Sequence, residues 1–117
     1  MKPSWNDYFW TIAQQVATRA TCPRASVGAV LVRDNRILAT GYNGAPSGEY
    51  ECLDVECDVV DGHCQRALHA EVNAIAYAAR AGIAIEGARL YLYNSRGDGV
   101  CRECMKVIKA AGVLVYV

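Results

Sequence analysis

The residue types best suited to metal chemistry fall in two short motifs, His69-x-Glu71 and Cys101-x-x-Cys104. One imidazole and two thiolates can hold a zinc ion and leave its fourth tetrahedral position open for water. Zinc lowers the pKa of that water towards about 7, and a carboxylate beside it can carry protons. We therefore predict a catalytic zinc site bound by His69, Cys101 and Cys104, with Glu71 as the proton shuttle.

Each motif alone is weak evidence for a catalytic zinc site, because a Cys-x-x-Cys pair is also found in redox sites and in halves of structural zinc sites. The combination is more specific, since both motifs stand at the start of a predicted helix. Cys101 and Cys104 are three residues apart and share a helix face, and a helix N-terminus favours the thiolate form. Glu71 also argues against a purely structural zinc, which needs no carboxylate at its side.

Helices and strands that position these motifs can be predicted from periodicity and capping residues. Ser4 is an N-cap for a first helix that ends before Cys22, and Asp34-Asn35 forms the turn of a hairpin. The glycine-rich stretch 41–48 is predicted to be a loop. The remaining elements are strands at 27–32, 36–40, 89–93 and 113–117 and helices at 69–81 and 101–111. The final alternation predicts parallel strands joined by crossover helices, the last strand being buried.

Composition restricts the class of protein. The 117 residues, 53% of them hydrophobic, suit one globular domain spanning 1–117. A formal net charge of +0 argues against a large nucleic-acid-binding surface. Neither a membrane-spanning apolar run nor a signal peptide is visible, so we expect a cytoplasmic protein without nucleic-acid or membrane partners.

A second group of ligand-type residues lies outside the two motifs. Its members are Cys22, Cys52, Cys57, His63 and Cys64. Most of them lie in the acidic, irregular stretch 49–64, which has little hydrophobic mass and needs something to order it. A structural zinc would do so, but it takes only four of these five donors. Disulfides are the alternative, which the absence of an export signal disfavours.

The motifs together resemble the zinc-dependent cytidine deaminase superfamily, whose motif is His-x-Glu followed by Pro-Cys-x-x-Cys. Within it, the chain is most similar to the deoxycytidylate (dCMP) deaminase branch, over nearly its whole length. The stretches that carry this resemblance are 22–24 (CPR), 27–30 (VGAV), 41–48 (GYNGAPSG), 62–64 (GHC) and 69–75 (HAEVNAI).

The resemblance implies a three-layer α/β fold of the cytidine deaminase type, with a mixed central sheet, an N-terminal hairpin and flanking helices. It implies hydrolytic conversion of dCMP to dUMP and ammonia, a step of pyrimidine nucleotide metabolism. A zinc-activated hydroxide would attack C4 of the ring, and Glu71 would protonate N3 and then the departing amine. Family contacts to the substrate carry over to Asn43, to the pocket wall at Val27, Gly28 and Ala29, and to Arg24 for the phosphate.

The resemblance also favours one catalytic and one structural zinc. In the family, ligands of a second zinc match Cys22 and Cys52, so we rank these two first, His63 and Cys64 next, and Cys57 last. A homo-oligomer, often a hexamer, and regulation by dCTP and dTTP are further expectations from the family.

Two departures from the family pattern affect the expected substrate. Val100 stands where a proline is expected, after the loop 95–99, in which Arg96 could meet a phosphate. The chain also stops at the strand after the third helix, whereas many relatives continue. A deaminase of another cytosine or aminopyrimidine nucleoside or nucleotide therefore remains the alternative enzyme, and an inactive zinc-stabilised binding module is the alternative outside enzymes.

Overall fold

The computed structural model describes residues 1–46, 48–60, 63–64 and 66–117, with only the backbone described for His63 and Cys64. The helices are α1 (Trp5–Ala17), α2 (Ala70–Ala81) and α3 (Arg102–Ala110). The strands are β1 (Val27–Arg33), β2 (Arg36–Tyr42), β3 (Val59–Val60), β4 (His63–Cys64), β5 (Arg89–Asn94) and β6 (Leu114–Tyr116).

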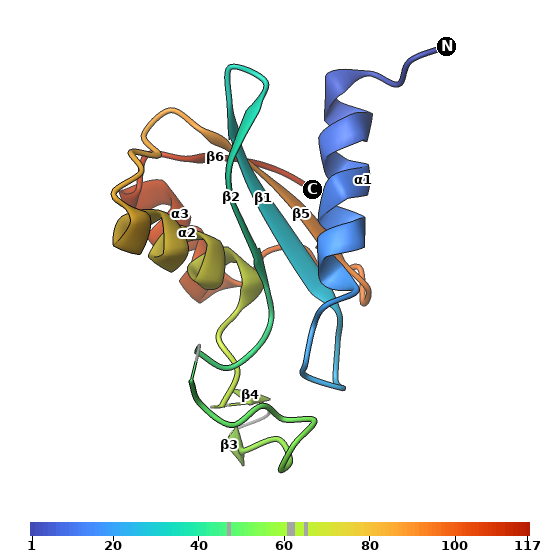
Figure 1. Cartoon of the computed structure of the whole chain (residues 1–117), viewed down its shortest axis with the longest axis vertical. Coiled ribbons are helices and arrows are strands. Elements are labelled where there is room, and N and C mark those ends of the chain that lie inside the picture. Colours follow the sequence, from blue (N-terminus) through green and yellow to red (C-terminus); the bar gives the residue numbers. More distant parts are fainter. Residues whose placement is uncertain (47, 61–62, 65) are drawn as a thin grey trace.

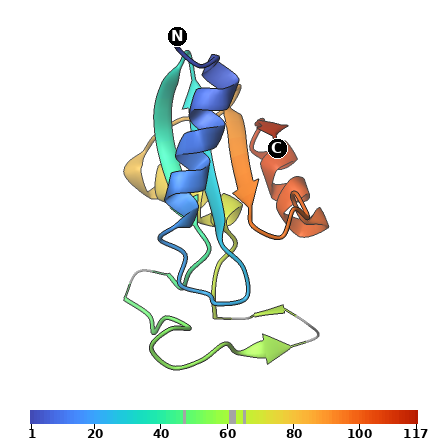
Figure 2. The same cartoon turned by 90° about the vertical axis from the view of Figure 1, so that its right-hand side faces the viewer.

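A four-stranded sheet in the order β2-β1-β5-β6 forms the middle layer. Strand β1 is antiparallel to β2 and β5, while β5 is parallel to β6, with α3 as the crossover between them. Helix α1 covers one face of this sheet, and α2 and α3 cover the other (Figures 1 and 2). The predicted three-layer α/β architecture with a mixed sheet is therefore confirmed.

The β1–β2 hairpin has the turn that the sequence predicts. Asp34 and Asn35 both have positive φ angles, 52° and 59°, as a two-residue type I′ turn requires. Strand β2 runs to Tyr42, two residues beyond the predicted end at Thr40, and Tyr42 pairs with Gly28. The predicted loop therefore begins later, at Asn43.

Helix α1 packs a narrow face against β1 and β5. Phe9, Ala13 and Ala17 are buried at intervals of four residues, and Ser4 caps the helix by accepting a hydrogen bond from the Asp7 N–H at 3.1 Å. Of the aromatic residues along this side of the helix, Phe9 is buried in the core. Trp5 and Tyr8 remain 56% and 44% exposed, because their rings pack around Phe9 at the edge of the helix face.

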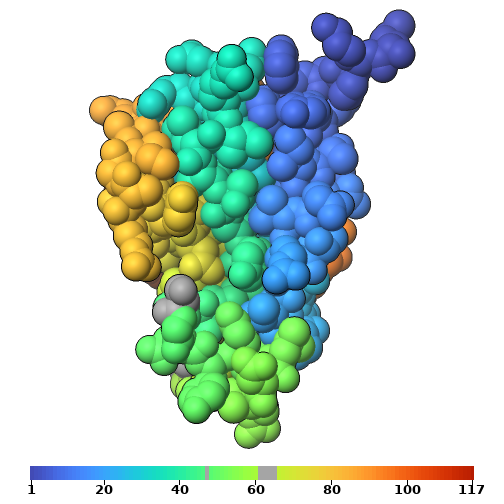
Figure 3. All heavy atoms as spheres, viewed as in Figure 1, coloured from blue at the N-terminus to red at the C-terminus, as the bar shows by residue number. Residues whose placement is uncertain are grey.

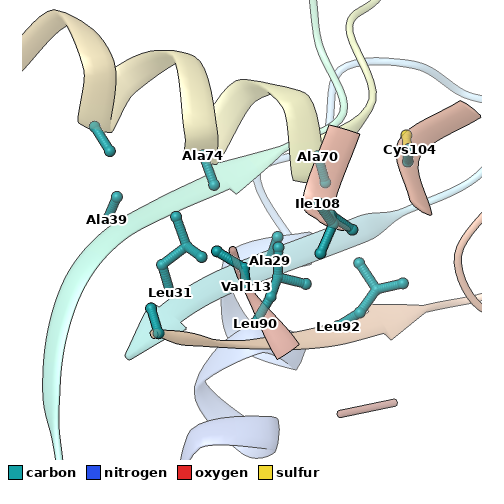
Figure 4. Packing of buried hydrophobic residues seen from close by; sticks show 12 residues of the cluster. Ala29, Leu31, Ala39, Ala70, Ala74, Leu90, Leu92, Cys104, Ile108 and Val113 are labelled. Atoms are coloured by element: carbon teal, nitrogen blue, oxygen red, sulfur yellow. The ribbon is translucent and has the colours of Figure 1, made fainter. Parts of the chain in front are cut away.

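Small residues bring α2 close to the sheet. Ala70, Ala74 and Ala78 are fully buried and face the aliphatic side chains of β1 and β5, with Ile108 of α3 entering the same core (Figure 4). A one-methyl side chain allows the helix axis to approach the strands. The N-terminus of α2 is thereby fixed at the end of the sheet where the cysteine motif begins.

Two sequence-based expectations for the fold were wrong. The last strand, β6, is an edge strand rather than a buried one, and Leu114 is 65% exposed, because β6 has a neighbour on one side only. The stretch 49–64 is not wholly irregular, since β3 and β4 pair antiparallel within it. Among the described residues, no helix combines the length and apolar composition needed to cross a membrane.

Candidate active site

The N-termini of α2 and α3 bring the first three predicted ligands together. His69 is the N-cap residue of α2, and Cys101 is the N-cap residue of α3. His69 Nδ1 lies 3.4 Å from Cys101 Sγ and 3.1 Å from Cys104 Sγ. Cys101 Sγ also accepts a hydrogen bond from the Cys104 N–H at 3.5 Å. Two helix termini, each with its positive dipole end, therefore face one small volume.

The spacing of these donor atoms suits zinc. In a tetrahedral site with ordinary bond lengths, a sulfur and a nitrogen ligand lie about 3.5 Å apart and two sulfurs about 3.7 Å apart. The donor atoms of His69, Cys101 and Cys104 all lie within 4.8 Å of one another. Three donors of this type fit a metal centre that keeps one position for a water or a substrate atom.

Glu71 lies beside these donors and is only 3% exposed. Burial raises the pKa of its carboxyl, while a backbone hydrogen bond, His69 and a hydrogen bond with Cys104 act in the opposite direction. Burial also raises the pKa of the Cys104 thiol, and the nearby Glu71 and Cys101 add to that increase. Two adjacent buried acids are costly to ionise together unless a cation compensates them, so the electrostatics also suit a metal.

A cavity of about 230 Å³ opens next to this centre. His69, Glu71 and Cys101 form one part of its lining, and Val27 and Asn43 form another. The structure thus brings most of the predicted catalytic and substrate-binding positions to one cavity, although they come from four separate parts of the chain.

Asn43 is buried in the cavity wall and is held by the segment that leads into β1. Its Oδ1 accepts a hydrogen bond from the Val27 N–H at 2.9 Å, and its Nδ2 donates to the Ala25 carbonyl at 2.8 Å. Each of these amide atoms can still form one further hydrogen bond. Asn43 can therefore join the loop to β1 and also contact a ligand.

Of the three residues predicted at the β1 wall, only Val27 lines the cavity. Ala29 is fully buried in the core beneath α2. A Cβ atom at Gly28 would lie 2.1 Å from the Ala13 carbonyl oxygen, so Gly28 faces the backbone of α1. Alternation of side-chain direction along a strand puts Gly28 on the opposite face from Val27 and Ala29.

Charged residues at the mouth of the cavity come from two loops. Arg24 follows α1, and the loop after β5 adds Arg96 and Asp98. Arg96 Nε and Asp98 Oδ2 form an exposed ion pair at 3.3 Å. Arg96 was predicted from the sequence as a candidate phosphate contact, whereas no motif pointed to Asp98.

Asn73, for which the sequence predicted no role, supports the loop that carries Asn43. Its Nδ2 donates to the Tyr42 carbonyl at 2.7 Å and to the Gly44 carbonyl at 3.3 Å, the two residues on either side of Asn43. A polar side chain in an otherwise alanine-rich helix was the signal that could have identified it. Asn73 ties the N-terminal half of α2 to the loop that carries Asn43.

Cys22, Cys52 and Cys57 form a second cluster, with sulfur atoms all within 4.8 Å of one another. Cys22 Sγ and Cys57 Sγ are 3.7 Å apart, which matches two sulfurs on a tetrahedral zinc and is far longer than a disulfide bond of about 2.05 Å. The side chains of the two other candidates, His63 and Cys64, lie outside the described residues.

Cys57, which the sequence ranked last of the five candidates, lies beside Cys22 and Cys52 in the structure. A turn folds the chain back after Cys52, with the N–H groups of Asp54 and Val55 donating to the Glu51 carbonyl at 3.0 and 3.2 Å. Asp54 Oδ2 in turn accepts a hydrogen bond from the Glu51 N–H at 3.3 Å. This reversal returns Cys57 to the side of Cys52.

Comparison with known proteins extends these observations. Residues 3–117 match the family model described as the cytidine and deoxycytidylate deaminase zinc-binding region. ComE operon protein 2 of Bacillus subtilis is 44% identical over 110 residues, which cover 94% of this chain and 56% of that protein. The deoxycytidylate deaminase of Mycobacterium phage D29 is 37% identical over 123 residues, covering 96% of this chain and 91% of the phage protein.

Among solved structures, the dCMP deaminase of the cyanophage S-TIM5 in complex with dCMP and dUMP is similar, with a TM-score of 0.79 and 32% identity. That match covers 99% of this chain and 85% of the phage chain. The deaminase-type fold expected from the sequence is thus confirmed. The chain spans little more than half the length of the Bacillus relative, 56%.

Proposed function

Because this chain belongs to the cytidine and deoxycytidylate deaminase family, we propose that it converts dCMP to dUMP and ammonia by hydrolysis. The observation that carries the proposal is the buried Glu71 beside the His69, Cys101 and Cys104 donors at a single cavity. The similarity to the S-TIM5 enzyme, whose structure contains dCMP and dUMP, supports the choice of substrate.

We propose that His69 Nδ1 and the thiolates of Cys101 and Cys104 hold the catalytic zinc. Zinc in such a site supplies Lewis-acid activation, which makes water a nucleophile near neutral pH. The chain's own contribution is placement, because both cysteines and the histidine are fixed at helix N-termini that favour their metal-binding forms.

Glu71 is assigned the proton transfers. Its carboxyl lies in the cavity lining and is withdrawn from solvent, so a proton that it accepts from water stays available for the substrate. In this assignment one proton of the water passes through Glu71 to the ring nitrogen N3, and the other passes through it to the amine that leaves C4 as ammonia. Asn43 and Val27 orient the nucleotide at the opposite wall, and Arg24 and Arg96 at the mouth face its phosphate.

A second candidate function is deamination of an unphosphorylated nucleoside, and one observation favours it. Asp98 also lines the mouth of the cavity and pairs with Arg96. Its negative charge repels a phosphate and offsets one of the two arginines.

A substrate panel tests both candidates. Ammonia release from the zinc-loaded protein is expected with dCMP, at a kcat/KM at least tenfold above that for deoxycytidine or cytidine. Arg24→Gln should raise the KM for dCMP by roughly tenfold, the loss of one charged hydrogen bond, and leave the deoxycytidine reaction unchanged. Equal or faster turnover of deoxycytidine would favour the nucleoside reaction, and no ammonia from any member of the panel would contradict both.

We further propose that the Cys22, Cys52 and Cys57 thiolates bind a second, structural zinc that orders residues 48–60. This segment exposes Tyr50, Leu53 and Val55 and has little buried apolar surface of its own, so its stability must come from bound metal and local hydrogen bonds. Cys22 belongs to this cluster and also lines the cavity beside the first cluster, which supports residues 1–117 acting as a single domain.

Removal of zinc should expose this segment to proteolysis. Chelation of the zinc-loaded protein is expected to raise cleavage by a glutamate-specific protease after Glu56 by about tenfold or more. Cleavage after Glu86, an exposed residue before β5, serves as the internal reference. A Cys101→Ser variant, which should lose only the catalytic zinc, is expected to retain protection at Glu56. Equal cleavage at Glu56 with and without metal would contradict the structural role.

A further inference from the structure

One carboxylate outside both metal clusters joins the second cluster to the substrate loop. Glu51 Oε2 accepts a hydrogen bond from the Thr21 hydroxyl and another from the Ala45 N–H, the latter at 3.1 Å. Glu51 is only partly exposed and does not line the cavity. Its two bonds are charge-assisted, which makes them stronger than bonds between neutral groups.

The positions of Thr21 and Glu51 in the chain connect this contact to the second cluster. Thr21 precedes Cys22, and Glu51 precedes Cys52, so each is the direct neighbour of one cysteine of the second cluster. Figure 3 shows that the segment 48–60 (green) forms a lobe at one end of the molecule, against the chain that follows α1 (blue). Any change in the spacing of Cys22 and Cys52 therefore acts on the Thr21–Glu51 contact.

The substrate loop is attached to the same contact from the other side. The Thr21 N–H donates to the Asn43 carbonyl at 3.1 Å, and Ala45, held by Glu51, is two residues further along the loop. Gly44 lies between them, where a Cβ atom would come within 2.8 Å of Thr21 Oγ1. The backbone of residues 43–45 is thus closely packed against Thr21 and Glu51.

We infer that Glu51 is a positioning residue that couples metal binding at Cys22, Cys52 and Cys57 to the placement of Asn43 in the substrate cavity. With metal bound, the two cysteine-bearing segments are held together, and Glu51 fixes the Ala45 N–H while Thr21 fixes the Asn43 carbonyl. Without the carboxylate, the two hydrogen bonds that Glu51 accepts are lost, while the Thr21 N–H still donates to the Asn43 carbonyl. The substrate part of this inference rests on the proposed function, but the metal part does not.

The test compares Glu51→Ala and Glu51→Gln with Glu49→Gln, a matched loss of one carboxylate at an exposed neighbour. In Glu51→Ala, zinc transfer from the second cluster to a colorimetric chelator is expected to become about tenfold faster, with the catalytic zinc retained. The KM for dCMP should rise by a similar factor, with kcat changed by less than about threefold. Glu51→Gln, which keeps an acceptor oxygen, should recover part of both effects, and Glu49→Gln should resemble the unmodified protein.

A double-mutant cycle tests the coupling itself. Cys57→Ser, which weakens the second cluster, is expected to raise the KM for dCMP alone but to add little in the Glu51→Ala background. Independent, additive effects on KM would overturn the coupling, and so would unchanged zinc release in both Glu51 variants. If the unmodified protein does not turn over dCMP, the proposed function fails, and the zinc-release rates still decide whether Glu51 supports the cluster.

Discussion

Replacement of Glu71 by glutamine is expected to reduce kcat for dCMP by roughly 10²–10⁴-fold, the range for loss of a general acid–base group. Glutamine has nearly the same volume and can occupy the buried position, but it neither accepts nor delivers a proton. The cavity and the three donors at His69, Cys101 and Cys104 should be preserved. Zinc content should therefore stay equal to that of the unmodified protein, so that the loss is in chemistry and not in metal binding.

The matched control is Glu103→Gln. Glu103 lies between the two cysteines of the same motif, but its side chain is 79% exposed and pairs with Lys106. An exposed ion pair of this kind contributes little to the stability of the fold, so loss of the Glu103 charge should change kcat by less than about threefold. Zinc analysis and steady-state kinetics on both variants check the prediction. Full activity in Glu71→Gln would exclude the proposed proton transfers, and zinc loss in it would show that Glu71 also supports the metal.

Local signals explain why much of the fold was predictable from the sequence. Ser4, the Asp34-Asn35 turn and Gly82 each specify the end of an element through their own backbone and side-chain chemistry. The grouping of His69 with Cys101 was accessible for the same reason, since both residues are helix N-caps. A motif at a helix N-cap predicts which end of the helix carries the donor atoms as well as which residues supply them.

The features that the sequence did not reveal depend on turns and contacts that no motif announces. Cys57 joins Cys52 because of a turn that depends on Asp54 and Glu51, and no strong turn residue such as glycine or proline announces it. Gly28 was expected at the pocket, although its neighbour in space is α1. Glu51 had no motif at all, because its importance comes from Thr21 and Ala45, which lie 30 and 6 residues away in the chain.

Gly41→Ala is expected to lower the stability of the protein substantially. A Cβ atom at Gly41 would lie 2.5 Å from both the Ala70 carbonyl oxygen and the Ala74 N atom. Because these are backbone atoms of α2, no rotamer change can relieve the clash, and the helix must move away from the sheet. Overpacking of this kind costs about 1–3 kcal/mol or more, which for a chain of this size lowers the Tm by roughly 5–15 °C.

Displacement of α2 should also disturb the catalytic site, since His69 and Glu71 stand at its N-terminus. Gly28→Ala is the matched variant, because the same added methyl group meets the backbone of α1 on the opposite face, at 2.1 Å from the Ala13 carbonyl oxygen. Both variants should lower the Tm. Zinc should be lost from the His69, Cys101 and Cys104 site at lower chelator concentration in Gly41→Ala only, because α1 carries none of these ligands. Equal zinc loss in the two variants would mean that general unfolding, and not movement of α2, releases the metal.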